Sequence, residues 1–365
     1  INDRRSLLPN NPIETFSITF PELKKELREK ADEEEYSSEV VKKKRMNSNK
    51  IPIKDFNFVE NIKENSKFFE EPFMATNTYI YEKVFQEMKK KDIKLILDGT
   101  DGDSVISHGK EIFSHYGERF EIKKLLKEKR SYDEKHNTVH SPLKTLFQYV
   151  VGPWIPRWIY RPYKRIRNKD YYYSQNILLN KTYRKSNKEL YRNVETIYKV
   201  NKDFLNFSDK AHFMMVYRSH WDDVFNILNT IAKKNNVEIR FPFFYQPLVN
   251  HCLKQSVTKK IKKGVTRYYF REALKDILPK KIYERHNKSD LSPIFFEHFM
   301  NIDSSYANQV FFDESSPIYN LIDQNQIKKL ISSKNKRKNL AVIFTFFSLY
   351  EWMKKNDFTI HVVKK

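Results

Sequence analysis

The feature that most constrains this sequence is a short apolar run that ends in an acidic, glycine-rich turn, LILDGTDGD at residues 95–103. The chain contains six glycines, and three of them fall between residues 95 and 109. This pattern predicts a buried strand that opens into a tight loop. Glycine lets backbone N–H groups approach a ligand, and carboxylates suit a hard cation such as Mg²⁺. The turn is a candidate phosphate and metal site at the carboxyl end of a parallel strand, although plain surface turns share its composition.

The composition indicates a folded protein with a basic surface. The chain has 365 residues, of which 39% are hydrophobic and 15% aromatic, enough for one large domain or two with a sizeable core. Its formal charge of +22 indicates either a nucleic-acid or anionic-membrane partner, or a lysine-rich surface on an enzyme with polyanionic substrates. We favour the enzyme, because Lys and Arg are spread along the chain rather than gathered in one tail.

Cysteine usage and hydropathy predict a cytoplasmic protein. The single cysteine, Cys252, excludes an internal disulfide and a cysteine-cluster zinc site, and its apolar neighbours predict a buried thiol. No signal peptide and no apolar run of membrane-spanning length is visible in the sequence. The chain begins with Ile rather than Met, so we expect it to be a fragment of a longer protein.

The first hundred residues alternate between strand-like and helical patterns. Residues 15–20 and 51–53 are β-prone, residues 24–46 and 77–90 have helical patterns, and residues 92–97 form the predicted strand before the glycine turn. This alternation predicts a parallel sheet with right-handed crossovers.

The middle of the chain has a different character. Between residues 113 and 206, charged helical stretches flank an aromatic and basic segment, Trp154–Arg165. Such segments can stack on bases or lie at lipid headgroups, but they also form ordinary connections whose rings pack inward while the charges stay hydrated. We favour the ordinary connection.

From residue 207 onward the pattern is mostly helical. Residues 213–231 and 340–353 are predicted apolar helices, and the second is expected to dock on the core. Residues 237–243 are predicted to be extended, and residues 262–277 to form a basic helix that ends before Pro279.

Several separated motifs follow one another in a recognisable order. They are DEEEY at 32–36, LDGTDGD at 97–103, NVEIRFPF at 236–243, GVTR at 264–267, FREAL at 270–274, LP at 278–279, RHNK at 285–288 and LYEW at 349–352. Together they resemble the synthetase domain of asparagine synthetase, a glutamine-hydrolysing enzyme, and its asparagine synthase-related relatives, which include the enzymes that close lasso peptides. The resemblance runs from about residue 13 to residue 355 and is weakest in the aromatic middle segment.

The resemblance implies an α/β fold. Its core would be a parallel sheet of the adenine nucleotide alpha hydrolase-like (ATP pyrophosphatase) type, incomplete at the N-terminus, with a large helical C-terminal part. We expect residues 1–112 to be the α/β nucleotide-binding part, residues 113–206 a helical aromatic and basic insertion, and residues 207–365 the mostly helical remainder of the same domain.

The activity implied by the resemblance is ATP-dependent carbon–nitrogen ligation. A substrate carboxylate attacks the α-phosphate of ATP, pyrophosphate leaves, and an amine then displaces AMP to give an amide. This chemistry requires a backbone cradle for phosphates, Mg²⁺, and a cation that balances the charge on the leaving pyrophosphate.

The resemblance also implies site residues. The residues that would contact ATP are Ile18, beside the adenine, and in the glycine turn Asp98, Gly99, Thr100 and Gly102. Asp103 would bind Mg²⁺, and Lys288 would be the catalytic cation, supported by Arg285. Simpler roles stay open, because Asp103 could cap the following helix and Lys288 lies in a generally basic loop.

The sequence departs from the family in several places. The family's pyrophosphate loop, Ser-Gly-Gly-x-Asp-Ser, should precede the first strand, yet no two of the six glycines are adjacent. The N-terminal glutaminase domain is also missing from this sequence, and we expect truncation rather than a degenerate site. Thr100 replaces the family's loop glutamate, and Phe244-Tyr245 replaces Leu-Asp, which argues against free aspartate as the substrate. The pattern from Arg285 to Leu291 fits the non-housekeeping members better.

These features lead to expectations about partners. We expect a small-molecule or peptide carboxylate, ammonia or another amine donor, and a glutaminase domain upstream, but neither nucleic acid nor membrane. A lasso-type macrolactam-forming enzyme and a non-catalytic relative that binds nucleotide or a partner remain alternatives. A third alternative, suggested by the charge and by Trp154–Arg165, is a basic protein that binds nucleic acid or a membrane surface.

Overall fold

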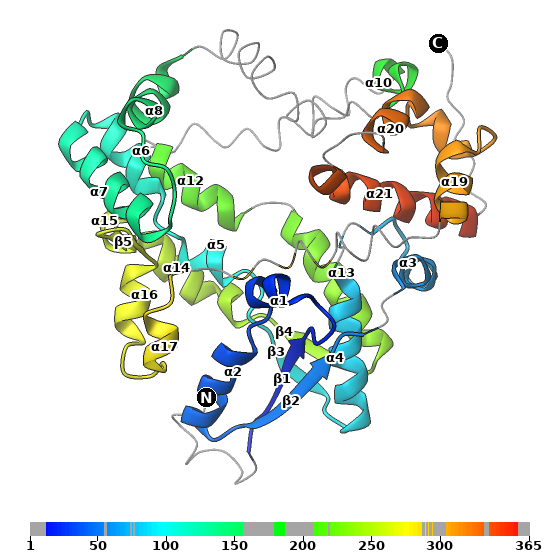
Figure 1. The fold of residues 1–365 in the computed structure, drawn as a ribbon, viewed down its shortest axis with the longest axis horizontal. Helices are drawn as coiled ribbons and strands as arrows, with labels where there is room; N and C mark the ends of the chain where they lie inside the picture. Colours follow the sequence, from blue (N-terminus) through cyan, green and yellow to red (C-terminus); the bar gives the residue numbers. More distant parts are fainter. Residues whose placement is uncertain are drawn as a thin grey trace.

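The computed structural model describes residues 12–54, 57–73, 75, 77–155, 179–186, 207–217, 220–286, 289, 291, 294, 304–331 and 336–356. The fold is mixed α/β and mostly helical (Figure 1). The elements up to residue 186 are β1 (Glu14–Thr19), α1 (Lys25–Ala31), α2 (Glu34–Lys44), β2 (Asn47–Pro52), α3 (Phe58–Ser66), α4 (Thr78–Lys90), β3 (Leu95–Leu97), α5 (Gly102–Ile106), α6 (Glu111–Glu118), α7 (Ile122–Lys135), α8 (Pro142–Leu146), the π-helix η2 (Phe147–Val151), the 3₁₀-helix η3 (Gly152–Trp154) and α10 (Lys181–Ser186).

The C-terminal elements include only short strands. They are α12 (Phe207–Val216), α13 (His220–Lys234), β4 (Glu238–Arg240), the 3₁₀-helix η5 (Pro242–Phe244), α14 (Gln246–Lys254), α15 (Val257–Lys260), β5 (Ile261–Lys262), β6 (Val265–Thr266), α16 (Tyr268–Ala273), α17 (Lys280–Tyr283), α19 (Ser304–Phe312), the 3₁₀-helix η6 (Pro317–Asn320), α20 (Gln324–Ile331) and α21 (Lys336–Lys355). No helix of the described residues is long and apolar enough to cross a membrane.

The expected parallel pairing is present, but in two separate pairs of strands rather than one sheet. β1 pairs with β2 in register from Glu14↔Asn47 to Thr19↔Pro52, and β3 pairs with β4 from Leu95↔Glu238 to Leu97↔Arg240. Helix α4 packs on both β1 and β2, and α13 packs on α4 and β4 (Figure 1). The two pairs are therefore linked through α4 and α13, which pack on each other.

One large core joins the sheets to the C-terminal helix. It contains Phe85 and Met88 of α4, Ile231 of α13, and Phe344 and Phe347 of α21. Ile18 of β1 and Ile96 of β3 pack against this same core. The prediction that residues 340–353 form a docked apolar helix is confirmed. Cys252 lies buried in α14, also as predicted.

The predicted helix over residues 24–46 is wrong in one respect, because Asp32 divides it into α1 and α2. Asp32 has extended backbone angles, φ −81° and ψ 129°. Its carboxylate accepts hydrogen bonds from the backbone N–H groups of Glu34, at 2.8 Å, and Phe20, at 3.4 Å. Aspartate competes in this way with helical backbone bonds, so it ends one helix and begins the next.

The predicted basic helix over residues 262–277 is also wrong. The chain forms the antiparallel pair β5–β6, then α16, and the turn between the strands contains Lys263 and Gly264, both with positive φ. A Cβ on Gly264 would lie 2.3 Å from the backbone oxygen of Ser131, and the Gly264 N–H donates to Glu128 at 2.8 Å. Packing on α7 therefore overrides the helical pattern.

The strand before the glycine turn was predicted to be buried, and it is only partly so. Leu95 and Leu97 are half-exposed, whereas Ile96 faces the core. The strand has three residues and, among the described residues, pairs on one side only, with β4. Successive side chains of a strand point to opposite faces, so Ile96 packs on the core while Leu95 and Leu97 lie on the other, less covered face.

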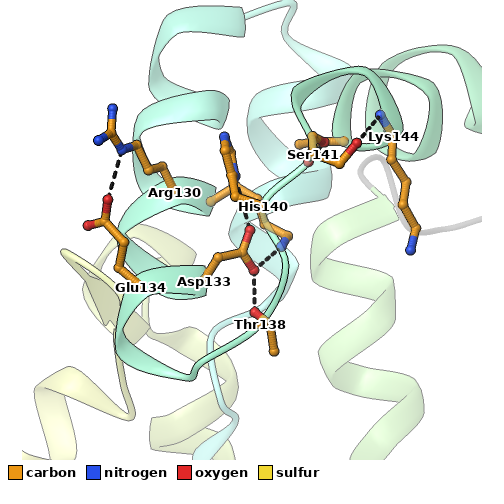
Figure 2. Close-up of polar contacts among 9 residues, drawn as sticks. Arg130, Asp133, Glu134, Thr138, His140, Ser141 and Lys144 are labelled. Atoms are coloured by element: carbon orange, nitrogen blue, oxygen red, sulfur yellow. Dashed lines mark hydrogen bonds and ion pairs between the residues drawn. The ribbon is translucent and has the colours of Figure 1, made fainter.

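Helices α6, α7 and α8 pack around a second, smaller core that α15 and β5 complete, with Ile112, Phe113, Leu125, Val257 and Ile261 at its centre. The loop between α7 and α8 is held by Asp133, whose buried carboxylate accepts hydrogen bonds from Lys129, Thr138 and His140 (Figure 2). Most of the aromatic and basic segment, residues 156–165, lies outside the described residues. The division at residues 112 and 206 stays a prediction.

Candidate functional site

The glycine turn lies where the parallel pair β3–β4 ends. The Asp98 N–H donates to the Arg240 carbonyl at 2.9 Å, which extends the pairing one residue beyond β3. Asp101 then adopts a left-handed conformation, with φ 53°, and α5 begins at Gly102. The predicted arrangement of strand, acidic turn and helix is confirmed. The turn is brought beside the segment that follows β4.

Inside the turn, Asp98 and Thr100 bond to each other. The Asp98 carboxylate accepts from the Thr100 N–H at 2.7 Å and also from the Thr100 hydroxyl. The Thr100 hydroxyl lies 3.2 Å from the hydroxyl of Tyr81 on α4. Burial, reinforced by the charge of Asp98, raises the pKa of Tyr81 to about 12, so this phenol stays protonated near neutral pH. Thr100 therefore anchors the turn to α4 at the position where a glutamate was expected.

Gly102 is where the turn approaches the segment after β4 most closely. A Cβ built on Gly102 would lie 2.8–3.0 Å from ring atoms of Phe243, whereas one on Gly99 meets nothing nearer than 4.0 Å. The Phe243 ring in turn packs near Phe270, with ring centroids 6.2 Å apart. The two sequence motifs thus interlock, and Gly102 is required by contact with Phe243 rather than by its own φ.

Asp103 on α5 forms an ion pair that the sequence did not predict. Its carboxylate lies 2.7 Å from Nη2 of Arg267 and 3.4 Å from Nε2 of His108. Arg267 precedes α16 in a left-handed conformation, with φ 54°. The buried Nε of Arg267 has no hydrogen-bond partner within the described part of the chain. An anionic ligand beside the turn could therefore accept a hydrogen bond from Nε of the Arg267 guanidinium.

The turn can be compared with what Mg²⁺ requires. Mg²⁺ usually takes one or two carboxylates and completes its shell with phosphates and water. Asp103 suits that role, although its carboxylate would have to exchange Arg267 for the metal. No group of three or more His, Cys, Asp or Glu side chains within the described ranges could hold a metal without such help. The donor set therefore fits a metal that arrives with phosphates.

Arg285 lies in a second cluster, built around the start of α2. Its guanidinium lies 3.0 Å from the Glu33 carboxylate, 3.9 Å above the Tyr36 ring centroid, and donates to the Ser289 hydroxyl at 2.7 Å. Glu33 and Tyr36 belong to the DEEEY motif, so two motifs separated by some 250 residues meet here. A guanidinium stacked on a ring and paired with a carboxylate is held in one orientation.

The backbone that carries Arg285 is itself held in place. Arg271, on α16, donates to the carbonyls of Thr266 at 3.1 Å, Tyr283 at 2.5 Å and Arg285 at 2.6 Å. Burial, together with nearby Arg267, lowers the pKa of Arg271. The FREAL motif therefore has a structural role: α16 orients the segment that leads to Arg285.

A pocket of about 370 Å³ opens beside this cluster. It is lined by Phe16, Ser17, Ile18, Ala31, Glu33, Ser37, Ser289 and Leu291. Its size lies within the range of about 300–1,000 Å³ that is usual for small-molecule sites. Ile18, predicted to flank adenine, is part of this lining together with other apolar side chains and three serine hydroxyls. The arrangement suits a flat, partly polar ring.

The predicted site residues therefore form two groups. Asp98, Gly99, Thr100, Gly102 and Asp103 form the turn, while Ile18 lines the pocket and Arg285 contacts two other lining residues, Glu33 and Ser289. Ile18 and Ile96, which lies two residues before Asp98, pack against the same core. Lys288, the predicted catalytic cation, lies outside the described residues.

Below the turn, a buried polar network holds α5. His212 on α12 donates from Nε2 to the carbonyls of Ser104 and Val105, both at 3.1 Å, and accepts at Nδ1 from Lys260, at 2.6 Å. Tyr269 donates to the Ile106 carbonyl at 3.0 Å. Burial, reinforced by the charge of Lys260, lowers the pKa of His212. These side chains satisfy the carbonyl end of a helix too short to satisfy itself.

The sequence did not identify Glu33, Tyr36, Arg267, Arg271 or His212 as site residues. Four of these residues lie inside the motifs that carry the resemblance: Glu33, Tyr36, Arg267 and Arg271. Those motifs therefore contain the signal that could identify them. His212 has no such signal, because a single histidine in an apolar helix is usually a core residue.

A larger pocket, of about 810 Å³, lies between residues 68–73 and α13. Its lining combines the carboxylates Glu70, Glu71 and Asp223 with the rings of Phe68, Phe69 and Phe73. Carboxylates beside aromatic faces favour a cationic guest. None of the predicted site residues lines it.

Comparison with known families identifies one match. The family model described as asparagine synthase matches residues 4–354. A search of curated proteins found no match.

Proposed function

The chain belongs to the asparagine synthase family, and from this premise we propose that it is an ATP-dependent amide ligase that adenylates a carboxylate and releases pyrophosphate. Family members are typically ATP-dependent carbon–nitrogen ligases, and the domain implies an adenine nucleotide alpha hydrolase-like fold. The observation that most supports the proposal is the cluster at Arg285, where the DEEEY and RHNK motifs meet at the pocket that contains Ile18. Bound ATP would supply the adenylyl group, and Mg²⁺ would balance the charge on its phosphates.

In this proposal the pocket at Ile18 binds the adenine ring. Phe16, Ile18 and Leu291 supply apolar contacts, and the lining serines supply hydroxyls that can bond to ring nitrogens. The pocket also excludes water from one side of the nucleotide. Arg285, fixed by Glu33 and Tyr36, then presents its charge at the rim.

The glycine turn would take the phosphates. Gly99 lies where an added Cβ has nothing nearer than 4.0 Å, so the backbone there is open to a ligand. Asp103 would hold Mg²⁺, and Arg267, released from Asp103, would balance an oxyanion. Lys288 would stabilise the charge that grows on pyrophosphate. The carboxylate and the amine remain general classes: a small molecule or a peptide for the first, and ammonia or an amine for the second.

The test is isotope exchange between ATP and pyrophosphate, catalysed by the full-length protein with amino acids or peptide carboxylates. Arg285→Lys keeps the positive charge but loses the planar guanidinium group and its paired N–H donors. We therefore expect the rate of ATP–pyrophosphate exchange to fall roughly a hundredfold. The matched control is Lys281→Gln, because Lys281 on α17 forms an exposed ion pair with Glu35 on α2, a few residues from the Arg285–Glu33 pair. We expect that change to leave exchange within about twofold.

Two further variants test the residues carried over from the family. Asp103→Ala and Lys288→Ala should each abolish exchange. Wild-type exchange in both would contradict the site assignment, whatever the substrate proves to be.

One observation favours a second candidate, a relative that binds nucleotide without turnover. Thr100 bonds to Asp98 and Tyr81, and Asp103 pairs with Arg267, so the turn makes internal contacts where a catalytic site needs free acidic groups. Saturable ATP binding by the full-length protein, with no exchange under any carboxylate, would support this candidate over the ligase.

A further inference from the structure

The segment formed by α8 and η2 carries one row of apolar side chains that packs on a core and a second row that is exposed. On its inner side, Leu146, Tyr149 and Val150 pack against the small core of α6 and α7. On its outer side, Leu143, Phe147 and Val151 recur at intervals of four residues and are exposed. A surface helix normally carries polar residues on the face away from its core. Packing of the helix on its core therefore does not explain why Leu143, Phe147 and Val151 are apolar.

Further exposed apolar side chains lie on the loop before α8 and on η3 directly after η2. Val139 and Leu143 are 93% and 81% exposed, and Trp154 and Phe120 are 67% and 62% exposed with their rings stacked at 6.4 Å. We call Phe120, Val139, Leu143, Phe147, Val151 and Trp154 the outer stripe. Thirteen large apolar side chains are exposed in the described residues, and six of them belong to this stripe. Concentration of this kind marks an interaction surface.

The stripe is carried by an ordered scaffold. Asp133 fixes the loop that contains Val139 through Thr138 and His140, and Ser141 accepts from the Lys144 N–H at the start of α8 (Figure 2). Figure 1 shows α8 at the periphery of the molecule, on the side of α6 and α7 away from the sheets. The surface is therefore accessible without rearrangement of the nucleotide site.

The charge around the stripe is positive. Residues 119–155 contain eight Lys or Arg and four Asp or Glu. One of those acids, Asp133, is buried and paired with Lys129, while Lys123, Lys127 and Lys144 are exposed. An anionic partner is thus favoured.

We propose that the outer stripe docks on an anionic lipid surface. Its aliphatic and aromatic side chains enter the headgroup layer, and the surrounding Lys and Arg bind lipid phosphates. This mode of binding lies in the membrane plane, in keeping with the finding that no described helix could span a bilayer. It departs from the sequence-based expectation that a membrane is not a partner.

Nucleic acid would suit this surface less well. Bases could stack on Phe120 or Trp154, and phosphates could bind the cations. A polyphosphate backbone, however, offers no apolar contact for the exposed aliphatic side chains Val139, Leu143 and Val151. Aliphatic, tryptophan and lysine side chains on one face are the combination expected at a lipid headgroup layer.

The experiment is co-sedimentation of the full-length protein with vesicles of phosphatidylcholine that contain a minority of phosphatidylserine, and with phosphatidylcholine alone. We expect binding to the anionic vesicles that weakens as salt is added, and little binding to the neutral ones. The double variant Val139→Ser/Leu143→Ser should bind roughly tenfold more weakly, and both sites are so exposed that folding should be preserved. Phe312→Ser, an exposed site on α19, is the matched control and should bind as wild type.

Tryptophan fluorescence supplies a second readout. A blue shift on addition of anionic vesicles that is lost in Trp154→Phe would place Trp154 in the headgroup layer. The proposal is overturned if the protein does not sediment with anionic vesicles at low salt, or if the double variant binds as wild type does. It is equally overturned if the wild-type protein binds duplex RNA but does not bind vesicles. The same holds if the stripe proves to be buried in a dimer that the double variant dissociates.

Discussion

Gly102 illustrates how one residue links two motifs that lie far apart in the sequence. The site where α5 begins touches the Phe243 ring so closely that a hydrogen atom is the only side chain that fits without movement. Phe243 is placed there by Pro242 and by the end of β4, which pairs with the strand before the turn. The geometry of the glycine turn therefore depends on a residue more than a hundred positions away.

We predict that Gly102→Ala lowers the free energy of unfolding by about 1–2 kcal/mol, since an overpacked contact outweighs the helix preference of alanine. Gly99→Ala is the matched control, with nothing nearer than 4.0 Å to its Cβ, and we expect a change below about 0.5 kcal/mol. Urea unfolding of the two variants measures the difference. In a Phe243→Leu background the Gly102 effect should shrink, and an undiminished effect would show that the ring contact is not its cause.

At the scale of single residues, the sequence predicts which residues form the turn better than it predicts which side chains those residues contact. Asp98, Gly99 and Gly102 could be assigned to a turn because glycine and aspartate have strong local preferences. The ion pair of Asp103 with Arg267 and the stacking of Arg285 on Tyr36 could not be predicted, because each joins segments that only the folded chain brings together. The Thr100 hydroxyl could be seen as a departure from the family, yet its contact with Tyr81 needed the structure.

At the scale of elements, adjacent positions on α7 have opposite environments. Asp133 is fully buried and holds Lys129, Thr138 and His140, whereas Glu134 forms an exposed pair with Arg130 at 2.8 Å (Figure 2). Burial by itself raises the pKa of Asp133, but the three hydrogen bonds outweigh it, and the pKa lies below its usual value. The α7–α8 loop is thus stabilised by one carboxylate.

Asp133→Asn should lower the free energy of unfolding by about 3 kcal/mol, since it leaves Lys129 without its buried counter-charge. Glu134→Gln, one residue along the same helix, should cost less than about 0.5 kcal/mol. Thermal unfolding monitored by circular dichroism compares the two. Equal effects would mean that the Asp133 network does not hold the loop as the contacts indicate.

The elements that were mispredicted share a cause. Residues 24–46 and 262–277 both have helical composition, and in both a tertiary contact overrides it: Asp32 bonds to Phe20, and Gly264 packs on Ser131. Residues 340–353 were predicted well because an apolar run of that length has one way to be buried. The exposure of Leu95 and Leu97 in β3 depends on which face of the strand the core covers, and an unbroken apolar run does not specify that face.

At the scale of the whole molecule, one core supports both halves of the proposed ATP site. Ile18 and Ile96 reach that core from different strand pairs, and α21 closes it with Phe344 and Phe347. A change deep in this core should therefore affect the pocket at Ile18 and the glycine turn together. The family resemblance could be seen in the sequence because its motifs sit at these supported positions, while the outer stripe has no motif and needed the exposed fractions to be seen.

Three histidines of the fold share a lowered pKa, which makes the fold sensitive to acid. Burial is the first cause for His136, His212 and His286, and for His212 the charge of Lys260 adds to it while Glu111 opposes it. A histidine whose folded pKa is lowered takes up its proton more readily in the unfolded chain. Stability is therefore complete above the ordinary histidine pKa of 6.5 and decreases as the pH falls below it.

We predict that the free energy of unfolding decreases between pH 7.5 and pH 5.5, by no more than about 1.4 kcal/mol per pH unit for each histidine, the limit set by one proton. His212→Gln keeps a donor for the carbonyls of Ser104 and Val105 but cannot take up a proton, so the decrease should become shallower without disappearing. Urea unfolding at a series of pH values measures the slope for both proteins. Because His212 holds the carbonyl end of α5, the protection factors of the α5 amides against hydrogen exchange should decrease in the wild type as the pH falls over the same interval. A wild-type stability that is flat between these pH values would contradict the assignment of His212 as a buried neutral histidine.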